Sequence, residues 1–353
     1  MNLRDASGDL HSKVSAEARE LATTAGHHSL SLTERLAAFG DIINLEVGDT
    51  SLVRSRNIER DHGLRQVFLK IEGDNPTGTQ KDRIGFAQVY DAMRRGFEVI
   101  SLATCGNYGV SIALAARLAG LKCRIYIPES YHSRRMDEMR RLGAIIKLLP
   151  GGYEEAVRRS SALATRYEWY DANPGGDNTA LQLRAYEEIA NEIYDHLRDA
   201  PRVCALPVSN GTLLAGVYRG FMALYKRGKT SRVPRIVGAS STFKNPIIHS
   251  FNKGLDTCVD LRPEQIRETD VNEPLINWHS FDGQEALSAI IASNGAAFNV
   301  NDQDMRRMST YLRRTEGKGV LPASTAGLIG LLRLHEHEPF EPDRYVAVLT
   351  ARM

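Results

Sequence analysis

Short apolar runs alternate with helical stretches along this chain from about residue 97 to its end, and one further apolar run precedes them. The runs are apolar almost throughout rather than at every second position, which is typical of parallel strands covered by helices on both faces. The predicted strands are Gln66–Ile71, Glu98–Leu102, Lys122–Ile127, Ile145–Leu149, Val203–Val208, Arg235–Ala239 and Tyr345–Leu349. The predicted helices are Tyr108–Leu118, Tyr153–Arg166, Ala180–Leu197, Leu213–Lys226 and Ser324–His335. Repeated strand–helix–strand units of this kind predict an α/β fold with doubly wound, mainly parallel sheets.

Two regions break this alternation. Residues 1–40 are polar with helical character, and we expect them to form an N-terminal extension that docks on the rest of the protein. Residues 243–283 carry prolines and many charges, and we expect a loop-rich insertion near the substrate.

The composition is that of an ordinary soluble globular protein, with 42% hydrophobic and 25% charged residues among 353. The formal net charge is only +2 and the basic residues are interspersed with acidic ones, which argues against a nucleic-acid partner. No apolar run is long enough to span a membrane, and the N-terminus lacks the apolar core of a secretory signal. The cysteines are far apart and form no metal-binding pair, so we expect free thiols, a cytoplasmic protein and no metal site. They are Cys105, Cys123, Cys204 and Cys258.

The segment of residues 72–83 carries the most specific chemical signal in the chain. It follows a predicted strand and leads into a helical pattern that begins near Asp82. A turn of Asn, Pro, Thr and Gly therefore presents Lys81 outside the carboxyl end of a strand, where α/β sheets place their ligands. Partial desolvation in such a crevice lowers the pKa of an ammonium group and frees the amine to act as a nucleophile.

This segment closely resembles the E-x-x-N-P-S/T-G-S/T-x-K-D-R motif of the fold type II pyridoxal-phosphate enzymes, which include threonine synthase, threonine ammonia-lyase, cysteine synthase and serine racemase. The resemblance implies that Lys81 carries pyridoxal 5'-phosphate as a Schiff base. One departure is Gln80, a polar residue where the family often has an aromatic or aliphatic one.

A second loop, residues 103–109, links a strand to a helix and offers main-chain N–H groups to an anion. It resembles the family's S/T-S/T-G-N-x-G/A turn, which implies that Asn107 hydrogen-bonds the ring oxygen of the cofactor. The same resemblance assigns the substrate carboxylate to Thr104, Cys105, Gly106 and Tyr108.

Cys105 departs from the serine or threonine that is usual at its position. A thiol loses its proton more readily than a hydroxyl, with a reference pKa of about 8.5. In the racemases of the family a serine here exchanges a proton on the face opposite the lysine, and Cys105 is a candidate for that role. The alternative is a small residue tolerated beside the cofactor.

A third loop joins the predicted strand at Val203–Val208 directly to a helix. Such a loop binds phosphate through successive main-chain amides and the helix dipole, although a plain helix cap explains its polar residues equally well. Its location matches the phosphate-binding loop of the family, but that loop is commonly a run of glycines and only one is present here. The residues that this match assigns to the cofactor are Ser209, Asn210, Gly211, Thr212 and Leu213.

Thr350 directly follows the last predicted strand and matches the hydroxyl residue that hydrogen-bonds the pyridine nitrogen in the family. Unlike a carboxylate, a hydroxyl does not enforce protonation of the ring, which suits eliminations and replacements better than transaminations. The Gly-His-Gly-Leu-Lys tail of threonine synthases does not follow it.

The resemblance also implies two domains, with a small domain of residues 84–178 inserted into a large one of residues 1–83 and 179–353. Lys81 would lie at their junction, and a homodimer is the usual assembly in the family. The branch most similar to this chain is that of threonine synthase.

The function that follows is a β- or γ-replacement or elimination on a small L-amino acid with a phosphorylated or acylated leaving group. Alternatives are a serine/threonine ammonia-lyase, an amino-acid racemase that uses Lys81 and Cys105, and a non-catalytic binding protein of the same fold. The cations available for a substrate phosphate are Arg83, Arg134, Arg135 and Lys244.

Overall fold

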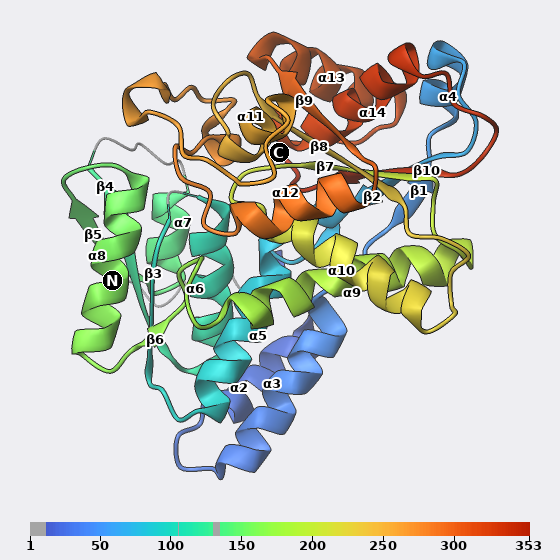
Figure 1. Ribbon diagram of the computed structural model, residues 1–353. Coiled ribbons are helices and arrows are strands. Elements are labelled where there is room, and N and C mark those ends of the chain that lie inside the picture. Colours follow the sequence, from blue (N-terminus) through green and yellow to red (C-terminus); the bar gives the residue numbers. More distant parts are fainter. Residues whose placement is uncertain (1–11, 105, 130–134) are drawn as a thin grey trace. The chain divides into compact units, whose positions relative to one another are not determined.

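The computed structural model describes residues 12–104, 106–129 and 135–353. These residues divide into two compact units, each built around its own sheet (Figure 1). The first unit contains residues 12–48 and 75–182, and the second contains residues 49–74 and 183–353.

The first unit is built on a sheet of parallel strands in the order β5-β4-β3-β6. The strands are β3 (Val99–Ala103), β4 (Lys122–Pro128), β5 (Ile145–Leu149) and β6 (Tyr170–Asp171). Its helices are α2 (Ala16–Ala25), α3 (Leu32–Glu46), α5 (Lys81–Arg94), α6 (Asn107–Ala119), α7 (Met136–Arg141) and α8 (Tyr153–Arg166). Helices α6 and α8 pack against β3 and β4, whose residues are buried almost throughout, so both faces of the sheet are covered.

The N-terminal helices α2 and α3 pack against each other and against α6 and α5. The Phe39 ring of α3 stacks on the Phe86 ring of α5, with 6.0 Å between the ring centroids. Helix α3 begins in a capping box, in which Ser31 and Glu34 bond each other's main-chain N–H groups. The described part of the predicted N-terminal extension is therefore a helical pair joined to the first unit. The whole of the expected small domain, residues 84–178, also belongs to this unit.

The second unit is built on a six-stranded sheet in the order β1-β2-β10-β7-β8-β9, in which only β1 is antiparallel to its neighbour. The strands are β1 (Leu52–Arg54), β2 (Val67–Ile71), β7 (Val203–Pro207), β8 (Arg235–Ser241), β9 (Ala296–Val300) and β10 (Tyr345–Leu349). The core of this unit lies between these strands and α14 (Ala326–His337). Helix α14 lies so close to β7 that a Cβ on Gly327 would come within 2.8 Å of the Leu206 main chain.

The remaining elements of the second unit surround this sheet (Figure 1). The helices are α4 (Arg56–His62), most of α9 (Thr179–Leu197), α10 (Thr212–Lys226), α11 (Pro246–Asn252), α12 (Gly283–Ala292) and α13 (Asp302–Thr315). Short 3-10 turns are η1 (Glu72–Asp74), η2 (Pro263–Gln265), η3 (Glu273–Leu275) and η4 (Pro322–Thr325). No helix among the described residues is both long enough and apolar enough to cross a membrane.

The α/β fold with mainly parallel sheets is confirmed, and each predicted strand lies within one or two residues of an observed one. Three strands were not predicted, namely β1, β6 and β9. Strands β1 and β6 have only three and two residues, and β9 is an edge strand interrupted by Asn299, so none forms a continuous apolar run. The stretch of residues 243–283 is largely loop, with α11 as its longest regular element.

Helices α9 and α10 offer a test of close packing. A Cβ on Gly220 of α10 would lie 2.6 Å from the Glu187 carbonyl oxygen and 2.7 Å from the Ala190 Cβ of α9. We therefore expect Gly220→Ala to lower the free energy of unfolding by about 1–3 kcal/mol, because the helices must move apart. The measurement is thermal unfolding followed by circular dichroism.

The matched control is Gly40→Ala in α3, where the nearest atom to a Cβ is 3.8 Å away on Tyr90. This change should raise the free energy of unfolding by about 0.5–1 kcal/mol, since only the entropic cost of a helical glycine is removed. A Gly220→Ala protein stabilised to the same degree would contradict the close packing of α9 on α10.

Candidate active site

In the first unit, Lys81 is the first residue of α5 and follows a tight turn. The Gly78 N–H donates to the Asn75 carbonyl at 2.8 Å, and Gly78 has a φ of 81°, in the left-handed region that favours glycine. The Ser111 hydroxyl of α6 donates to the Lys81 carbonyl at 2.9 Å. The half-buried Lys81 side chain places Nζ 5.4 Å from the centroid of the Tyr108 ring. The amine therefore lies over an aromatic face, an arrangement that attracts its charged form.

Asp82 fixes the turn that precedes this lysine. Its fully buried carboxylate accepts hydrogen bonds from the Thr77 N–H and from the Thr77 hydroxyl, both at 2.7 Å. Burial raises the pKa of Asp82 from 3.8 to about 6, and the hydrogen bonds from Thr77 and Ser111 oppose that rise. One carboxylate thus joins the turn to the start of α5 and limits where Lys81 can lie.

Hydrogen bonds and close packing fix the position of Tyr108. Its hydroxyl donates to the Ala172 carbonyl at 2.8 Å and accepts a hydrogen bond from the Gln88 amide. The ring is buried, and the next residue, Gly109, packs so tightly that a Cβ would meet Met139 Cε at 2.7 Å. The face that Tyr108 turns toward Lys81 therefore has little freedom to move.

The turn before α6 carries the other predicted residues of this unit. The Thr104 N–H donates to the Tyr126 carbonyl at 3.0 Å, and the Gly106 N–H donates to the Thr104 hydroxyl at 3.4 Å. Gly106 is the N-cap of α6, and no side chain caps this helix start among the described residues. Its first N–H groups are therefore available to an anion. Cys105 lies outside the described residues.

Arg135 orients Asn107, a contact that sequence reasoning did not find. The Arg135 guanidinium donates to Asn107 Oδ1 at 2.5 Å, to the Thr77 carbonyl at 2.9 Å and to Glu138 at 2.9 Å. Since the amide oxygen of Asn107 accepts from Arg135, its Nδ2 group remains as the donor for another partner. Arg135 thus joins the turn before Lys81 to the start of α6.

In the second unit, the start of α10 carries the predicted phosphate loop. Gly211 has a φ of 98°, and a Cβ there would lie 2.8 Å from both Ala286 Cβ and the Asp282 carbonyl oxygen. Gly211 is the helix N-cap, so no side chain caps the first N–H groups of α10, which include those of Thr212 and Leu213. This helix start fits a phosphate group, because its main-chain donors and its dipole both favour an anion.

The loop before Gly211 is held by buried asparagines. Asn245 Nδ2 donates to the Ser209 carbonyl at 2.9 Å, and Asn277 Nδ2 donates to Asn210 Oδ1 at 3.0 Å. Asn245 also caps α11. Its position directly before a proline is the local pattern by which this helix start could have been recognised in the sequence. Nothing in the local sequence indicates the role of Asn277.

The Thr212 hydroxyl donates to the carboxylate of Asp282, which precedes α12. The hydroxyl hydrogen of Thr212 is therefore used in the bond to Asp282. The donors that remain for an anion at this helix start are main-chain N–H groups. The family resemblance assigned Thr212 to the cofactor, but nothing in the sequence indicated its partner Asp282.

Thr350 follows β10 and is almost buried, and its hydroxyl lies 3.0 Å from the Ser324 hydroxyl. Ser324 also accepts from the Ala351 N–H at 2.9 Å, which fixes the end of the strand. Because β10 and β7 are neighbouring parallel strands, Thr350 and the loop of residues 208–211 lie at the same carboxyl edge of the sheet. The Thr350 hydroxyl and the start of α10 thus share one edge of this unit's sheet.

The other cations considered for a substrate phosphate differ in environment. Arg83 is buried within α5, and Lys244 donates to the Arg267 carbonyl at 2.6 Å near the protein surface. Arg134 lies outside the described residues. Arg135 contacts both loops of the first unit that carry predicted site residues.

Comparisons with known proteins cover nearly the whole of this architecture. A family model described as pyridoxal-phosphate dependent enzyme matches residues 43–351. The threonine synthase of Methanocaldococcus jannaschii is 29% identical over 311 residues, which cover 88% of this chain and 75% of that protein. The crystal structure of O-ureido-L-serine synthase matches with a TM-score of 0.70 at 22% identity, covering 87% of this chain and 90% of that chain. Maize serine racemase matches with a TM-score of 0.74 at 16% identity, covering 90% of this chain and 92% of that chain. The fold is that of the fold type II enzymes.

The raised pKa of Asp82 predicts how stability depends on pH. The folded chain binds this proton more tightly than the unfolded chain, because the pKa is about 6 rather than 3.8. Protonation of Asp82 therefore contributes its full stabilisation below about pH 4. This contribution to the free energy of unfolding, up to roughly 3 kcal/mol, is lost as the pH rises through 6. We expect Asp82→Asn to remove this part of the pH dependence of the free energy of unfolding, measured by urea titration between pH 4 and pH 7.

The control is Asp137→Asn on α7, whose carboxylate is 75% exposed. It should leave the pH dependence as in the unaltered protein. An Asp82→Asn protein with the same slope as the unaltered protein would show that Asp82 is not the group that titrates.

Proposed function

Because this chain belongs to the family of pyridoxal-phosphate dependent enzymes, we propose that it catalyses β- or γ-replacement or elimination on a small L-amino acid. The substrate carries a phosphorylated or acylated leaving group. Bound pyridoxal phosphate withdraws electrons from the substrate carbon that bears the amino group, so that a proton can leave that carbon. The observation that carries the proposal is the family's lysine segment, whose Lys81 begins α5 over the Tyr108 ring.

Lys81 is assigned two tasks. Its ε-amine is the group that would hold the cofactor covalently, and once free it would be the base that takes the proton from the substrate Cα. The hydrogen bonds of Asp82 and Ser111 fix the main chain around Lys81, and the rigid Tyr108 ring limits the positions of its side chain. A positioned amine can serve in both steps without a second base.

Asn107 is assigned to the ring oxygen of the cofactor. Its amide oxygen accepts from Arg135, so that the NH₂ group is the part of the side chain that can donate. Thr104, Gly106 and Tyr108 are assigned to the substrate carboxylate, which suits the uncapped N–H groups at the start of α6. Cys105 keeps its assignment from the family resemblance.

The second unit is assigned the phosphate group and the ring nitrogen. The main-chain N–H groups at the start of α10 suit the phosphate, with Gly211 allowing its close approach. The hydroxyl of Thr350, placed by Ser324, is assigned to the pyridine nitrogen. Since a hydroxyl does not enforce a positive charge on the ring, this pairing favours elimination and replacement.

The similar proteins named threonine synthase support a reaction that forms an amino acid, with which γ-replacement is consistent. The structure titled O-ureido-L-serine synthase supports the fold. The proposal also includes β-replacement, which begins with the same removal of the Cα proton.

The covalent role of Lys81 has a direct test. Borohydride reduction of the cofactor-loaded protein, followed by proteolysis and mass spectrometry, should find the pyridoxyl group on Lys81, because reduction makes the bond to the amine permanent. Lys81→Ala should lose both the label and all turnover. The control, Lys226→Ala on the exposed end of α10, should keep both. A label on a different lysine would contradict the assignment.

The reaction class is tested with a panel of O-phosphohomoserine, O-phosphoserine, O-acetylserine, serine and threonine. We expect release of phosphate or acetate from one of the first three, measured together with the visible spectrum of the cofactor. Keto acid formed from serine or threonine alone would favour an ammonia-lyase instead. Solvent deuterium that enters Cα without loss of a leaving group would favour a racemase. Absence of any spectral response would overturn the proposed class.

A further inference from the structure

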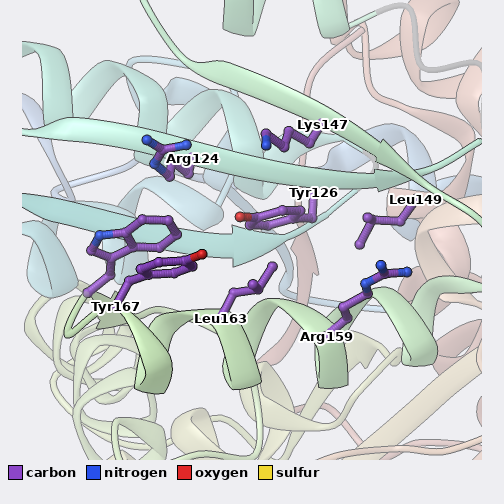
Figure 2. A pocket seen from close by; sticks show the side chains of 8 residues that line it. Arg124, Tyr126, Lys147, Leu149, Arg159, Leu163 and Tyr167 are labelled. Atoms are coloured by element: carbon purple, nitrogen blue, oxygen red, sulfur yellow. The ribbon is translucent and has the colours of Figure 1, made fainter.

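The first unit contains a cavity of about 420 Å³ that none of the assigned cofactor or substrate residues lines. It lies between α8 and the strands β4 and β5, and Figure 2 shows the strand side chains facing those of the helix. The lining consists of three cations, three aromatic rings and two leucines, namely Arg124, Lys147, Arg159, Tyr126, Tyr167, Trp169, Leu149 and Leu163. Its volume falls within the range of about 300–1,000 Å³ that is usual for small-molecule sites.

The three cations of this cavity have no counter-ion among the residues that the structure describes. No carboxylate lines the cavity, and Arg124, Lys147 and Arg159 form no ion pair within the described part of the chain. The Nε atom of Arg124 is buried and has no hydrogen-bond partner among the described residues. Three uncompensated positive charges around one cavity favour an anion, and a guanidinium group suits phosphate or carboxylate oxygens in particular.

Stacked aromatic rings hold one of these charges, that of Arg124, in place. The Arg124 guanidinium lies 4.5 Å from the centroid of the Trp169 ring, and that ring stacks on Tyr167 with 4.8 Å between centroids. Arg166 covers Tyr167 in the same way, at 5.4 Å. Tyr126 and the two leucines add apolar surface to the wall. A ligand with only a charged group would leave this surface unused, whereas an organic anion with a planar body contacts both parts of the lining.

We propose that this cavity is a second binding site, separate from the proposed active site, for a small organic anion that joins a phosphate group to an aromatic ring. Lys147 and Arg159 are exposed and reach the phosphate oxygens from opposite walls, while Arg124 and its aromatic neighbours contact the ring. The site does not depend on the reaction assigned to the enzyme, because its residues and those of the active site do not overlap.

The test uses the cofactor-loaded protein and phenyl phosphate as the probe. The chain has two tryptophans, so a Trp278→Phe background leaves Trp169 as the reporter of binding at the cavity. Phenyl phosphate should change the Trp169 fluorescence saturably. Lys147→Gln and Arg159→Gln should each weaken its binding about tenfold, the effect of losing one charge-assisted hydrogen bond.

The controls separate the two parts of the proposed ligand. Lys226→Gln, which removes an exposed charge elsewhere, should bind phenyl phosphate as the unaltered protein does. Inorganic phosphate and phenol should each bind at least tenfold more weakly than phenyl phosphate. Equal affinity for inorganic phosphate or for phenol would overturn the assigned ligand class. A lack of saturable binding, or binding unchanged in both cavity variants, would overturn the site. Turnover of the variants without the probe should be unchanged.

Discussion

The position of Lys81 depends first on one physical constraint, the buried carboxylate of Asp82. Taking a carboxylate out of water is costly unless its oxygens are hydrogen-bonded. Here Thr77 supplies both a main-chain and a side-chain donor, five residues before the carboxylate. The turn is thereby closed onto the helix start. The adjacent lysine is at the same time held through its carbonyl by Ser111, so a long flexible side chain begins from a fixed point.

In the proposed assignment, the residues that carry the chemistry are divided between the two units. The first contributes the amine, the oriented amide of Asn107 and an uncapped helix start. The second contributes another uncapped helix start and a buried hydroxyl at the carboxyl edge of its sheet. The groups proposed to react are thus carried by the first unit, and the groups proposed to anchor the cofactor phosphate and ring nitrogen are carried by the second. Parallel sheets suit such a division, because the loops that follow their strands gather at one edge.

The sequence predicted the parts of this structure that local patterns encode. Buried parallel strands are continuous apolar runs, so β2, β3 and β10 could be recognised directly. Lys81 could be identified because a turn, a strand end and a specific motif coincide there. The fold class and the cofactor family followed from these signals.

The supporting residues could not be predicted, because their partners lie far away in the sequence. Arg135 is 28 residues from Asn107, and Asp282 is 70 residues from Thr212. A polar residue in a loop has the same local pattern whether it faces solvent or holds a distant carbonyl. The packing partners of the first forty residues were unknown for a similar reason, since one stacked pair of phenylalanines forms only after the chain has folded.

The loop before α10 has a consequence for how this protein evolves. Two side-chain amides hold this loop: Asn245 donates to the Ser209 carbonyl, and Asn277 donates to the side-chain oxygen of Asn210. A braced loop is already ordered when its ligand arrives, so less conformational entropy is lost on binding than a glycine-rich segment would lose. The loop geometry therefore depends on two residues that lie far from the loop in the sequence. Substitutions of these two residues should persist in evolution only together with substitutions in the loop itself.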